Sequence, residues 1–534
     1  MASSKVGSKS GRRAGLGLRA AGLGIALLFA LPLLYLVVRA FTEEADLLSL
    51  ALSGRSLAPA ARSVLLGISV AVGATLVGTS TAWLVARTDL PGRRLWRVVL
   101  PLPLVFPSFV GAFVMLAAFA PGGLVSLIGF EVGRIDGFVG SLLVLTVFTY
   151  PYVYLPVAAR IRGLPPSLEE SARLLGLRPL RSFWTVVIPQ IADAMVGGAL
   201  LVFLYTISDF GVVQLMRFPT LTRSIYANRL FDRPTSIALS LLLAALALVA
   251  VAAERFATRR LRKVPSGAAA RPFRIRLGKW KAVASAFVAA VVALSLAVPI
   301  GVLAWWVIRS LTRGPGTMAA TVESLTDLWG PTLNTAAVSL AAALVAVVLI
   351  LPVAYLTSRG RSRSAAIANA VVLVGFALPG LALALALVFW TLGSPGLLGW
   401  LYQSLPLLIL AYVLHFGAHP LRTTRSSLLA MPERVEDAAR TLGASRWRRL
   451  IRVELPLIGP GMVAGAGLVL LSVMKELPAT LLLAPAGFST LAVEVWQATE
   501  SALFAQASLA ALVLVALSGI LTWWLVIRRS DGAN

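Results

Sequence analysis

The sequence lacks cysteine altogether, and this absence excludes two kinds of chemistry. Without a thiol the chain forms no disulfide and holds no metal through thiolate ligands. It also lacks the G-x-x-x-x-G-K-[ST] phosphate loop, so it does not bind and hydrolyse ATP through that motif. No nucleophile paired with a base and no set of metal ligands stands out. We therefore expect a chain that is not an enzyme and that carries no cofactor or metal site of its own.

Charge is also scarce. Charged residues make up 13% of the 534 residues, hydrophobic residues make up 58%, and the mean hydropathy is +0.87. Apolar runs of about twenty residues recur along the chain, and a helix of that length crosses the hydrocarbon core of a bilayer. The net charge of +26 would suggest nucleic acid as the partner of a soluble protein. Here most arginines lie in short loops beside apolar runs, where they set topology, so we expect a lipid bilayer and no nucleic acid.

The apolar runs predict an all-α polytopic membrane protein with about twelve spans, six in each half. The spans are expected near residues 18–40, 63–86, 97–120, 138–160, 193–215 and 236–256, and near 282–308, 334–357, 366–391, 404–422, 460–483 and 503–527. The first run is longer than the apolar region of a signal peptide and lacks a convincing cleavage site, so we expect it to be retained. Lys and Arg gather in the two tails, the central linker and the loops on the same side, which predicts that both termini are cytoplasmic. The loop "RFPTLTRSIYANRLFDRPTS" is an exception, because it is basic and predicted to lie outside.

The two halves are related by an internal repeat. "ESARLLGLRPLRSFWTVVIP" at residues 170–189 aligns without a gap with "DAARTLGASRWRRLIRVELP" at residues 437–456, and "AWLVAR" near residue 82 resembles "AYLTSR" near residue 354. Because each half has an even number of spans, the repeats run in the same sense and their axis lies along the membrane normal. We expect a first six-span repeat over residues 1–256, a basic cytoplasmic linker over 257–281 and a second repeat over 282–534.

Each of the two aligned stretches is predicted to form a short amphipathic helix, a glycine bend and a basic helix that leads to a proline. Gly176 and Gly443 suit the left-handed residue that ends a helix. A single basic amphipathic loop would most often rest on lipid headgroups. Two loops on the same face with the same spacing instead favour a two-fold-symmetric partner that docks from the cytoplasm.

At these residues the chain resembles the permease subunits of binding-protein-dependent ABC importers. The resemblance implies a type I ABC importer permease fold in a bacterial inner membrane. It also implies two copies of a cytoplasmic ATPase that binds the ATP, and a periplasmic or lipid-anchored substrate-binding protein. In that family the "EAA" loop supplies the helix that couples to the ATPase. Carried over to this sequence, the coupling residues are Glu170, Ser171, Ala172, Gly176, Pro189, Asp437, Ala438, Ala439, Gly443 and Pro456.

The segments "SDFGVVQLMRFPTLTRSIYANRLF" and "MKELPATLLLAPAGFSTLAVEVWQATESALFAQAS" resemble the fused permeases of ferric-iron importers. This resemblance implies that ferric iron is moved inward by alternating access. Permeases for thiamine, polyamines, phosphonates and sulfate are related alternatives. A gradient-driven secondary transporter is an alternative of another class, because it can also have twelve spans in two parallel repeats, but it gives no reason for two matched docking loops.

Two acids, Asp209 and Glu476, lie within predicted spans at equivalent positions of the two repeats. Acids inside a bilayer are costly and usually face a bundle interior or an aqueous path. They are candidate pathway residues, since a hard cation prefers oxygen ligands, and a structural role is equally open. His415 and His419 lie four apart on one predicted helical face, but no third ligand is near in sequence. We expect them to pack between helices rather than to bind a metal.

Overall fold

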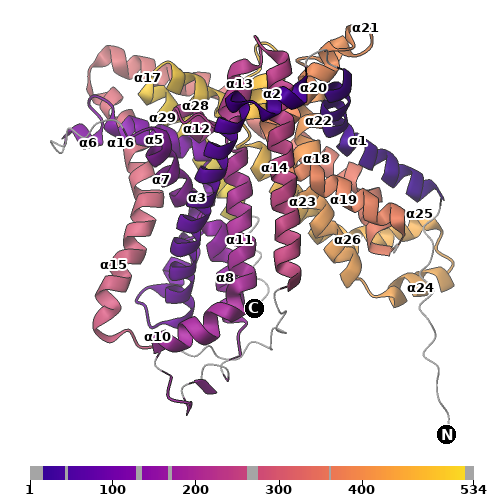
Figure 1. The fold of residues 1–534 in the computed structure, drawn as a ribbon, viewed down its shortest axis with the longest axis horizontal. Coiled ribbons are helices and arrows are strands. Elements are labelled where there is room, and N and C mark those ends of the chain that lie inside the picture. Colours follow the sequence, from indigo (N-terminus) through magenta and orange to yellow (C-terminus); the bar gives the residue numbers. More distant parts are fainter. Residues whose placement is uncertain are drawn as a thin grey trace. The chain divides into compact units, whose positions relative to one another are not determined.

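The computed structural model describes residues 16–42, 46–127, 135–165, 167, 171–172, 174–177, 179–260, 275–359 and 362–523. Within these ranges the chain is helical, and its β-structure is one isolated bridge between Thr88 and Ile275. Nine of the described helices are long and apolar enough to cross a membrane, or up to twelve if each of three bent helix pairs counts as one span. The prediction of an all-α chain with about twelve spans is confirmed (Figure 1).

The chain divides into two compact units that do not coincide with the two sequence repeats. Unit 1 comprises residues 1–38, 333–488 and 521–534, and unit 2 comprises residues 39–332 and 489–520. The second repeat therefore contributes its first span and its last helices to unit 2. Within that unit, the indole Nε1 of Trp306 donates a hydrogen bond to the carbonyl of Ala117 at 3.0 Å, which ties a helix of the second repeat to one of the first.

Unit 2 is built around three helices that lie side by side, α3, α8 and α11 (Figure 1). Its described elements are α2 (Leu47–Leu52), α3 (Gly54–Arg87), α4 (Arg93–Val99), η1 (Leu102–Val105), α5 (Ser108–Phe119), α6 (Leu124–Leu127), α7 (Gly137–Thr149), α8 (Pro151–Arg162), α10 (Pro179–Ser182), η2 (Phe183–Val187), α11 (Ile188–Ser208), α12 (Gly211–Leu215), α13 (Leu221–Asn228), α14 (Arg233–Arg260), η3 (Gly278–Trp280), α15 (Lys281–Val292), η4 (Ala293–Ala297), α16 (Val298–Thr312), α17 (Pro315–Asp327), α28 (Leu491–Glu500) and α29 (Phe504–Thr522). Small residues let membrane helices approach closely. A Cβ at Gly198 of α11 would lie 2.9 Å from the Cα of Val153 in α8.

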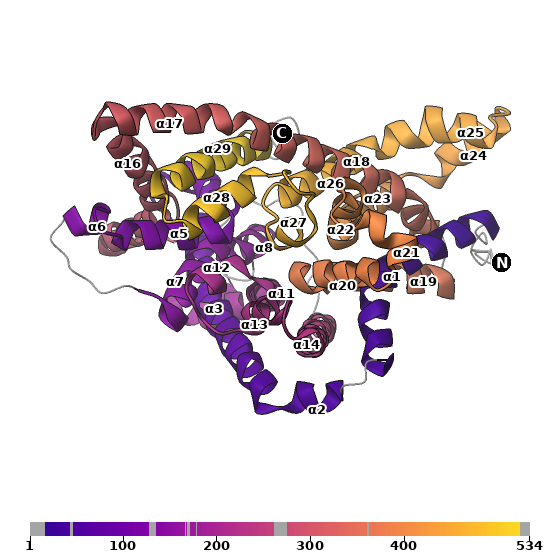
Figure 2. The same cartoon turned by 90° about the horizontal axis from the view of Figure 1, so that it is seen from above.

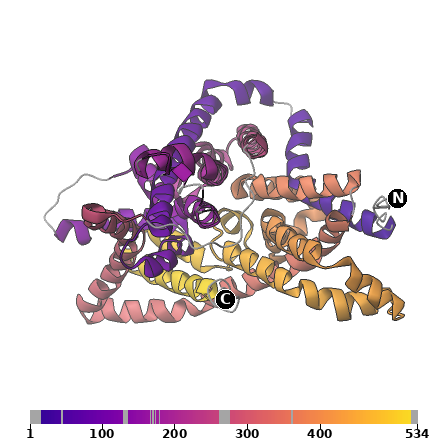
Figure 3. The ribbon, with the colours of Figure 1, turned by 90° about the horizontal axis from the view of Figure 1, so that it is seen from below.

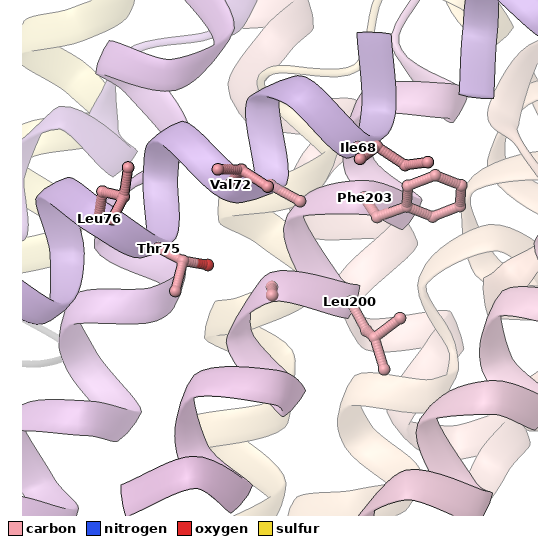
Figure 4. Close-up of a pocket in the computed structure, with 8 residues that line it drawn as sticks. Ile68, Val72, Thr75, Leu76, Leu200 and Phe203 are labelled. Atoms are coloured by element: carbon pink, nitrogen blue, oxygen red, sulfur yellow. The ribbon is translucent and has the colours of Figure 1, made fainter. Parts of the chain in front are cut away.

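An apolar groove lies between α3 and α11 on unit 2 (Figure 4). It has a volume of about 370 Å³, and Ile68, Val72 and Leu76 of α3 face Leu200 and Phe203 of α11 across it. None of its eight lining residues is charged. The groove therefore offers a cation no carboxylate, and the Thr75 hydroxyl is the polar side-chain group in its lining.

Unit 1 contains α1 (Leu16–Thr42), most of which belongs to it, and the central part of the second repeat (Figures 2 and 3). Its other elements are α18 (Trp329–Arg359), α19 (Arg363–Ala377), α20 (Gly380–Leu392), α21 (Pro395–Leu398), η5 (Gly399–Leu401), α22 (Leu405–Phe416), α23 (Ala418–Ala430), α24 (Glu433–Thr441), α25 (Arg446–Arg449), η6 (Leu450–Glu454), α26 (Leu455–Val473) and α27 (Pro478–Leu483). A Cβ at Gly465 of α26 would lie 2.6 Å from the Cα of Pro420 in α23. Gly465 and Pro420 are the equivalents of Gly198 and Val153, so the two repeats use the same close helix contact.

Three predicted spans are not straight helices. The span predicted at 97–120 is bent by 91° near Pro107, and the span predicted at 366–391 is bent by 103° near Pro379. The residue before a proline is pushed out of the helical region, and Phe106 and Leu378 are extended, with ψ of 131° and 125°. The span predicted at 404–422 is bent by 54° at Gly417. The apolar runs located these spans correctly but did not show that they are broken.

Proline also explains the π-helical segments of the described chain. The segments η2, η4 and η6 each end two residues before a proline, at Pro189, Pro299 and Pro456. A proline within a helix lacks an N–H and its ring collides with the carbonyl four residues earlier. A wider π turn accommodates that collision. Since η2 and η6 are equivalent, each aligned loop continues into the next span through the same local distortion.

The C-terminal end of the predicted linker is held by the loop that follows α3. The backbone N–H of Ile275 donates to the carbonyl of Arg87 at 2.8 Å. The Asp89 carboxylate accepts a hydrogen bond from the N–H of Leu277 at 2.9 Å and lies 2.9 Å from the Nζ of Lys281. These two donors hold the pKa of Asp89 below its usual value. The start of the second repeat is thereby fixed to the first repeat, while residues 261–274 lie outside the described chain.

Candidate functional site

Both aligned loops end their first helix in the same way. Gly176 and Gly443 have φ of +78° and +76°. The N–H of Leu177 donates to the carbonyl of Ala172, and the N–H of Ala444 donates to that of Ala439, both at 3.0 Å. These are the six-to-one hydrogen bonds of a Schellman motif, in which the left-handed glycine follows the helix cap. The four-residue spacing from alanine to glycine in both loops is therefore the spacing that this helix ending requires.

The bend exposes a leucine in each loop. Ala172 and Ala439 are buried, whereas Leu175 and Leu442, one residue before each glycine, are 82% and 87% exposed. Large exposed apolar groups at equivalent points of two loops are typical of an interaction site.

The remaining predicted coupling residues occupy the same two loops. Ser171, Asp437 and Ala438 are exposed, and Glu170 lies outside the described residues. Pro189 and Pro456 are exposed and stand at the second position of α11 and of α26. In unit 1, α24 lies at the end away from α21, and in unit 2, α10 lies at the end away from α13 (Figure 1).

The second loop is anchored by a buried polar network that sequence reasoning missed. The Tyr355 hydroxyl of α18 donates to Oε2 of Glu454 at 2.7 Å, and Nε of Arg449 donates to Oε1 at 2.9 Å. Glu454 is 3% exposed. In the first loop the corresponding contact is aromatic, because Trp83 of α3 lies 5.1 Å from Phe183, centroid to centroid. Each loop is thus held against the second span of its repeat, the second loop by charged hydrogen bonds and the first loop by aromatic packing.

Asp209 and Glu476 lie at helix breaks and not within continuous spans. α11 ends at Ser208 and α26 ends at Val473, so the predicted spans 193–215 and 460–483 are too long. Asp209 Oδ1 accepts a hydrogen bond from the N–H of Val212 at 2.8 Å, and Glu476 Oε1 accepts one from the N–H of Ala479 at 3.2 Å. Each carboxylate therefore binds the start of the short helix that follows, which is the work of an N-terminal capping residue.

The two capping acids are embedded in complementary ways. The Ser108 hydroxyl at the start of α5 donates to Asp209 Oδ2 at 2.5 Å. Gly380 stands at the start of α20, and a Cβ there would lie 2.9 Å from Glu476 Oε1. A serine thus accompanies the shorter acid, and a glycine makes room for the longer one. Both acids therefore have partners within the chain, and their role in the transport path stays a prediction.

The two histidines do not lie on one helix. His415 lies in the last turn of α22 and His419 belongs to α23, beyond the 54° bend, so they are not on one continuous helix, although both rings lie beside the ring of Phe376. The His415 ring lies 4.4 Å from the ring of Phe416, and the His419 ring lies 5.1 Å from that of Phe376. In the part of the chain that the structure describes, no three His, Cys, Asp or Glu side chains are grouped to hold a metal ion.

Comparison with known proteins agrees with this geometry. The family model described as the binding-protein-dependent transport system inner membrane component matches residues 74–263 and 350–528, once in each repeat. The Fe(3+)-transport system permease protein FbpB 2 of Haemophilus influenzae is 30% identical over 506 residues, which are 93% of this chain and 95% of that protein. The sulfate transport system permease protein CysT of Salmonella typhimurium is 28% identical over 36% of this chain and 72% of its own length. The molybdenum transport system permease protein ModB of Escherichia coli is 28% identical over 31% of this chain and 77% of its own length. The chain therefore belongs to the family of binding-protein-dependent transport system inner membrane components, as a protein that carries the family domain twice.

Proposed function

We propose that this chain is the membrane permease of an ATP-driven importer that brings ferric iron into the cytoplasm. A permease of this family works with a substrate-binding protein, and its energy comes from an ATPase. The cargo rests on the likeness to an Fe(3+) transport permease along nearly the whole chain. The shorter sulfate and molybdenum permeases match only about a third of it.

Two ATPase subunits would dock on the two loops, one on each. The observation that carries this proposal is the matched bend, which exposes Leu175 and Leu442 at equivalent points. Because α10 and α25 continue through π segments into α11 and α26, a displacement of either loop would pass directly to a membrane-spanning helix. Closure of the two ATPases would then switch the permease between two access states. A docked partner can shift this equilibrium only if it binds the two states with different affinity. In this arrangement both loops, the linker and both termini face the cytoplasm of a bacterial inner membrane, and a periplasmic or lipid-anchored protein delivers the iron on the other side.

Docking is tested by charge placed on the exposed leucines. Leu175→Asp and Leu442→Asp, together, are expected to abolish co-purification of the ATPase, because they put carboxylates into an apolar contact. The matched controls are Leu230→Asp and Leu397→Asp, since these leucines are 73% and 74% exposed and lie at the opposite ends of the units. Retention of the ATPase by the first pair, or its loss from the control pair, would contradict docking at the bends.

The cargo is tested with the reconstituted complex. Proteoliposomes that contain the permease, its ATPase and its binding protein are expected to accumulate radioactive ferric iron only when ATP is supplied. Sulfate, molybdate, thiamine, a polyamine and a phosphonate should neither accumulate nor compete. ATP-driven uptake of one of these instead of iron would refute the cargo and leave the permease assignment standing.

A further inference from the structure

The second helix of each aligned loop exposes the same two kinds of side chain. Arg181 and Arg448 stand at equivalent positions of the two repeats, and both are exposed. Three residues later stand Trp184 and Ile451, which are 62% and 57% exposed. Each helix therefore presents an arginine and a large apolar side chain about one turn apart. Docking at the glycine bends uses neither of them.

Both pairs lie where a membrane span begins. The candidate spans run from Phe183 to Ser208 and from Trp447 to Val473, with 26 and 27 residues. About twenty helical residues cross the hydrocarbon core, so each span is long enough to extend into the headgroup layer. Arginine is costly inside the core, and near a helix end its long side chain reaches the interface. The ends that carry Arg181 and Arg448 therefore lie in the headgroup layer.

The second repeat adds two more exposed groups to this surface. Trp447 is 73% exposed and Arg452 is exposed. Tryptophan is enriched where a membrane meets water. Arg449 differs from its neighbours, because its Nε donates to the buried Glu454 and its side chain is only 12% exposed. One arginine of this helix thus holds the loop to the protein, while Arg448 and Arg452 are left at the surface.

The exposed groups match the chemistry of an anionic phospholipid. A guanidinium binds phosphate oxygens through paired hydrogen bonds, and apolar side chains of an interfacial helix enter the boundary between headgroups and acyl chains. Residues 178–188 and 445–453 contain no acid that would repel the phosphate. A protein partner could also carry negative charge, but both helices continue directly into a span. The first helix of the second loop, α24, lies farther than α25 from α21, at the opposite end of unit 1 (Figure 1).

We propose that the second helix of each loop is a binding site for the headgroup of an anionic phospholipid. Arg181 binds it in the first loop, and Arg448 and Arg452 bind it in the second. The lipid lies in the leaflet on the side of the docked ATPase, so each loop is divided between a protein partner at its bend and lipid at its second helix. This inference takes the orientation of the loops from the proposed function, but it does not depend on iron as the cargo.

Site-directed fluorescence quenching tests the site, and the absence of cysteine allows a single label without background mutations. Ile451→Cys carries a bimane label in vesicles of phosphatidylglycerol and phosphatidylcholine, without ATPase. A trace of one lipid or the other bears a nitroxide near its headgroup. Labelled phosphatidylglycerol is expected to quench about threefold more strongly than labelled phosphatidylcholine, because arginines near the surface attract anionic lipid.

Matched variants separate charge from exposure. Arg448→Ala/Arg452→Ala should abolish the preference for phosphatidylglycerol, and Arg448→Lys/Arg452→Lys should keep most of it. Arg434→Ala should also keep it, since Arg434 is exposed on α24 in the same loop. A label at Leu392→Cys should show no preference, because this leucine ends α20, is 48% exposed, and lies in a stretch, residues 364–421, without Lys, Arg, Asp or Glu. In the first loop, Arg181→Ala should abolish the preference of a label at Trp184→Cys.

An Ile451→Cys label quenched equally by the two lipids, or a preference that survives Arg448→Ala/Arg452→Ala, would overturn the proposal. Quenching by neither lipid, together with a change in bimane emission when ATPase is added, would assign the surface to the ATPase instead. Iron uptake by a complex whose label shows no lipid preference would remove the lipid site and leave the proposed function intact. A lipid preference in a complex that takes up no iron would support the site and count against the cargo alone.

Discussion

The buried network of Glu454 is expected to stabilise the second of the two aligned loops by an amount that a double-mutant cycle can measure. Tyr355→Phe removes one hydrogen bond to a charged acceptor, which costs about 1.5–3 kcal/mol. Glu454→Val removes the carboxylate from Arg449, whose side chain is 12% exposed, and breaking a buried ion pair costs about 3–5 kcal/mol. The first repeat has Ser182 and Val187 at these positions. We therefore expect Arg449→Ser/Glu454→Val to be more stable than Glu454→Val alone, because it removes both members of the pair.

The assay is the thermal unfolding of the purified proteins in detergent, with Arg449→Ser included to complete the cycle, followed by binding of the ATPase to each of the five proteins. The expected order of stability is wild type, then Tyr355→Phe, then Glu454→Val, with the double variant above Glu454→Val. ATPase binding should weaken in the same order, since Tyr355 and Glu454 fasten the loop to α18. Additive losses in the double variant, or a Glu454→Val protein as stable as wild type, would show that the network does not hold the loop.

Three further predictions follow from the contacts of single residues. Gly465→Ala should destabilise the protein by about 1–3 kcal/mol through overpacking. Gly459→Ala, with nothing within 4 Å of the new Cβ, should stabilise it by up to about 1 kcal/mol. Equal melting temperatures of the two variants would refute the close contact at Gly465. Asp89→Asn should speed proteolytic cleavage at the end of the linker near neutral pH, measured with trypsin there and with pepsin in acid, where trypsin is inactive. The folded pKa of Asp89 is lowered, so its contribution to stability is present above the unfolded pKa of about 3.9 and is lost as pH falls through the folded pKa. The difference in cleavage rate between the variant and wild type should therefore vanish in acid. A difference that persists in acid would show that the Asp89 carboxylate does not hold the end of the linker. Gly380→Ser should destabilise the protein by crowding Glu476, and adding Glu476→Asp should recover part of the lost stability. A double variant no more stable than Gly380→Ser would show that the Asp209 and Glu476 arrangements are not interchangeable.

The sequence was sufficient for the features that rest on local pattern. In the described chain the apolar runs located each of the up to twelve spans, counting each bent pair as one, and the glycines Gly176 and Gly443 predicted the left-handed bends. Both depend on residues close together in the chain, where periodicity and backbone preference act directly. The resemblance carried by the two loops also led to the family that the comparisons establish.

The features that the sequence did not reveal depend on contacts between distant segments. Tyr355 and Glu454 are 99 residues apart, and the sequence around neither residue predicts contact with the other. Asp209 also has partners that the sequence did not reveal, namely Ser108, 101 residues earlier, and the N-terminus of α12. The Phe210 ring of the first repeat lies 5.4 Å from the Trp496 ring of the second, centroid to centroid, and this contact could be found only once the chain was folded.

The most direct test of the central claim is ferric-iron uptake in the source cells under iron limitation. A deletion strain is complemented with the wild-type gene or with Gly176→Val/Gly443→Val, whose β-branched valines are strained at positive φ and should disrupt both bends. We predict that the deletion loses uptake, that wild type restores it, and that the double variant reaches the membrane without restoring it. Undiminished uptake in the deletion strain, or full restoration by the double variant, would contradict the account.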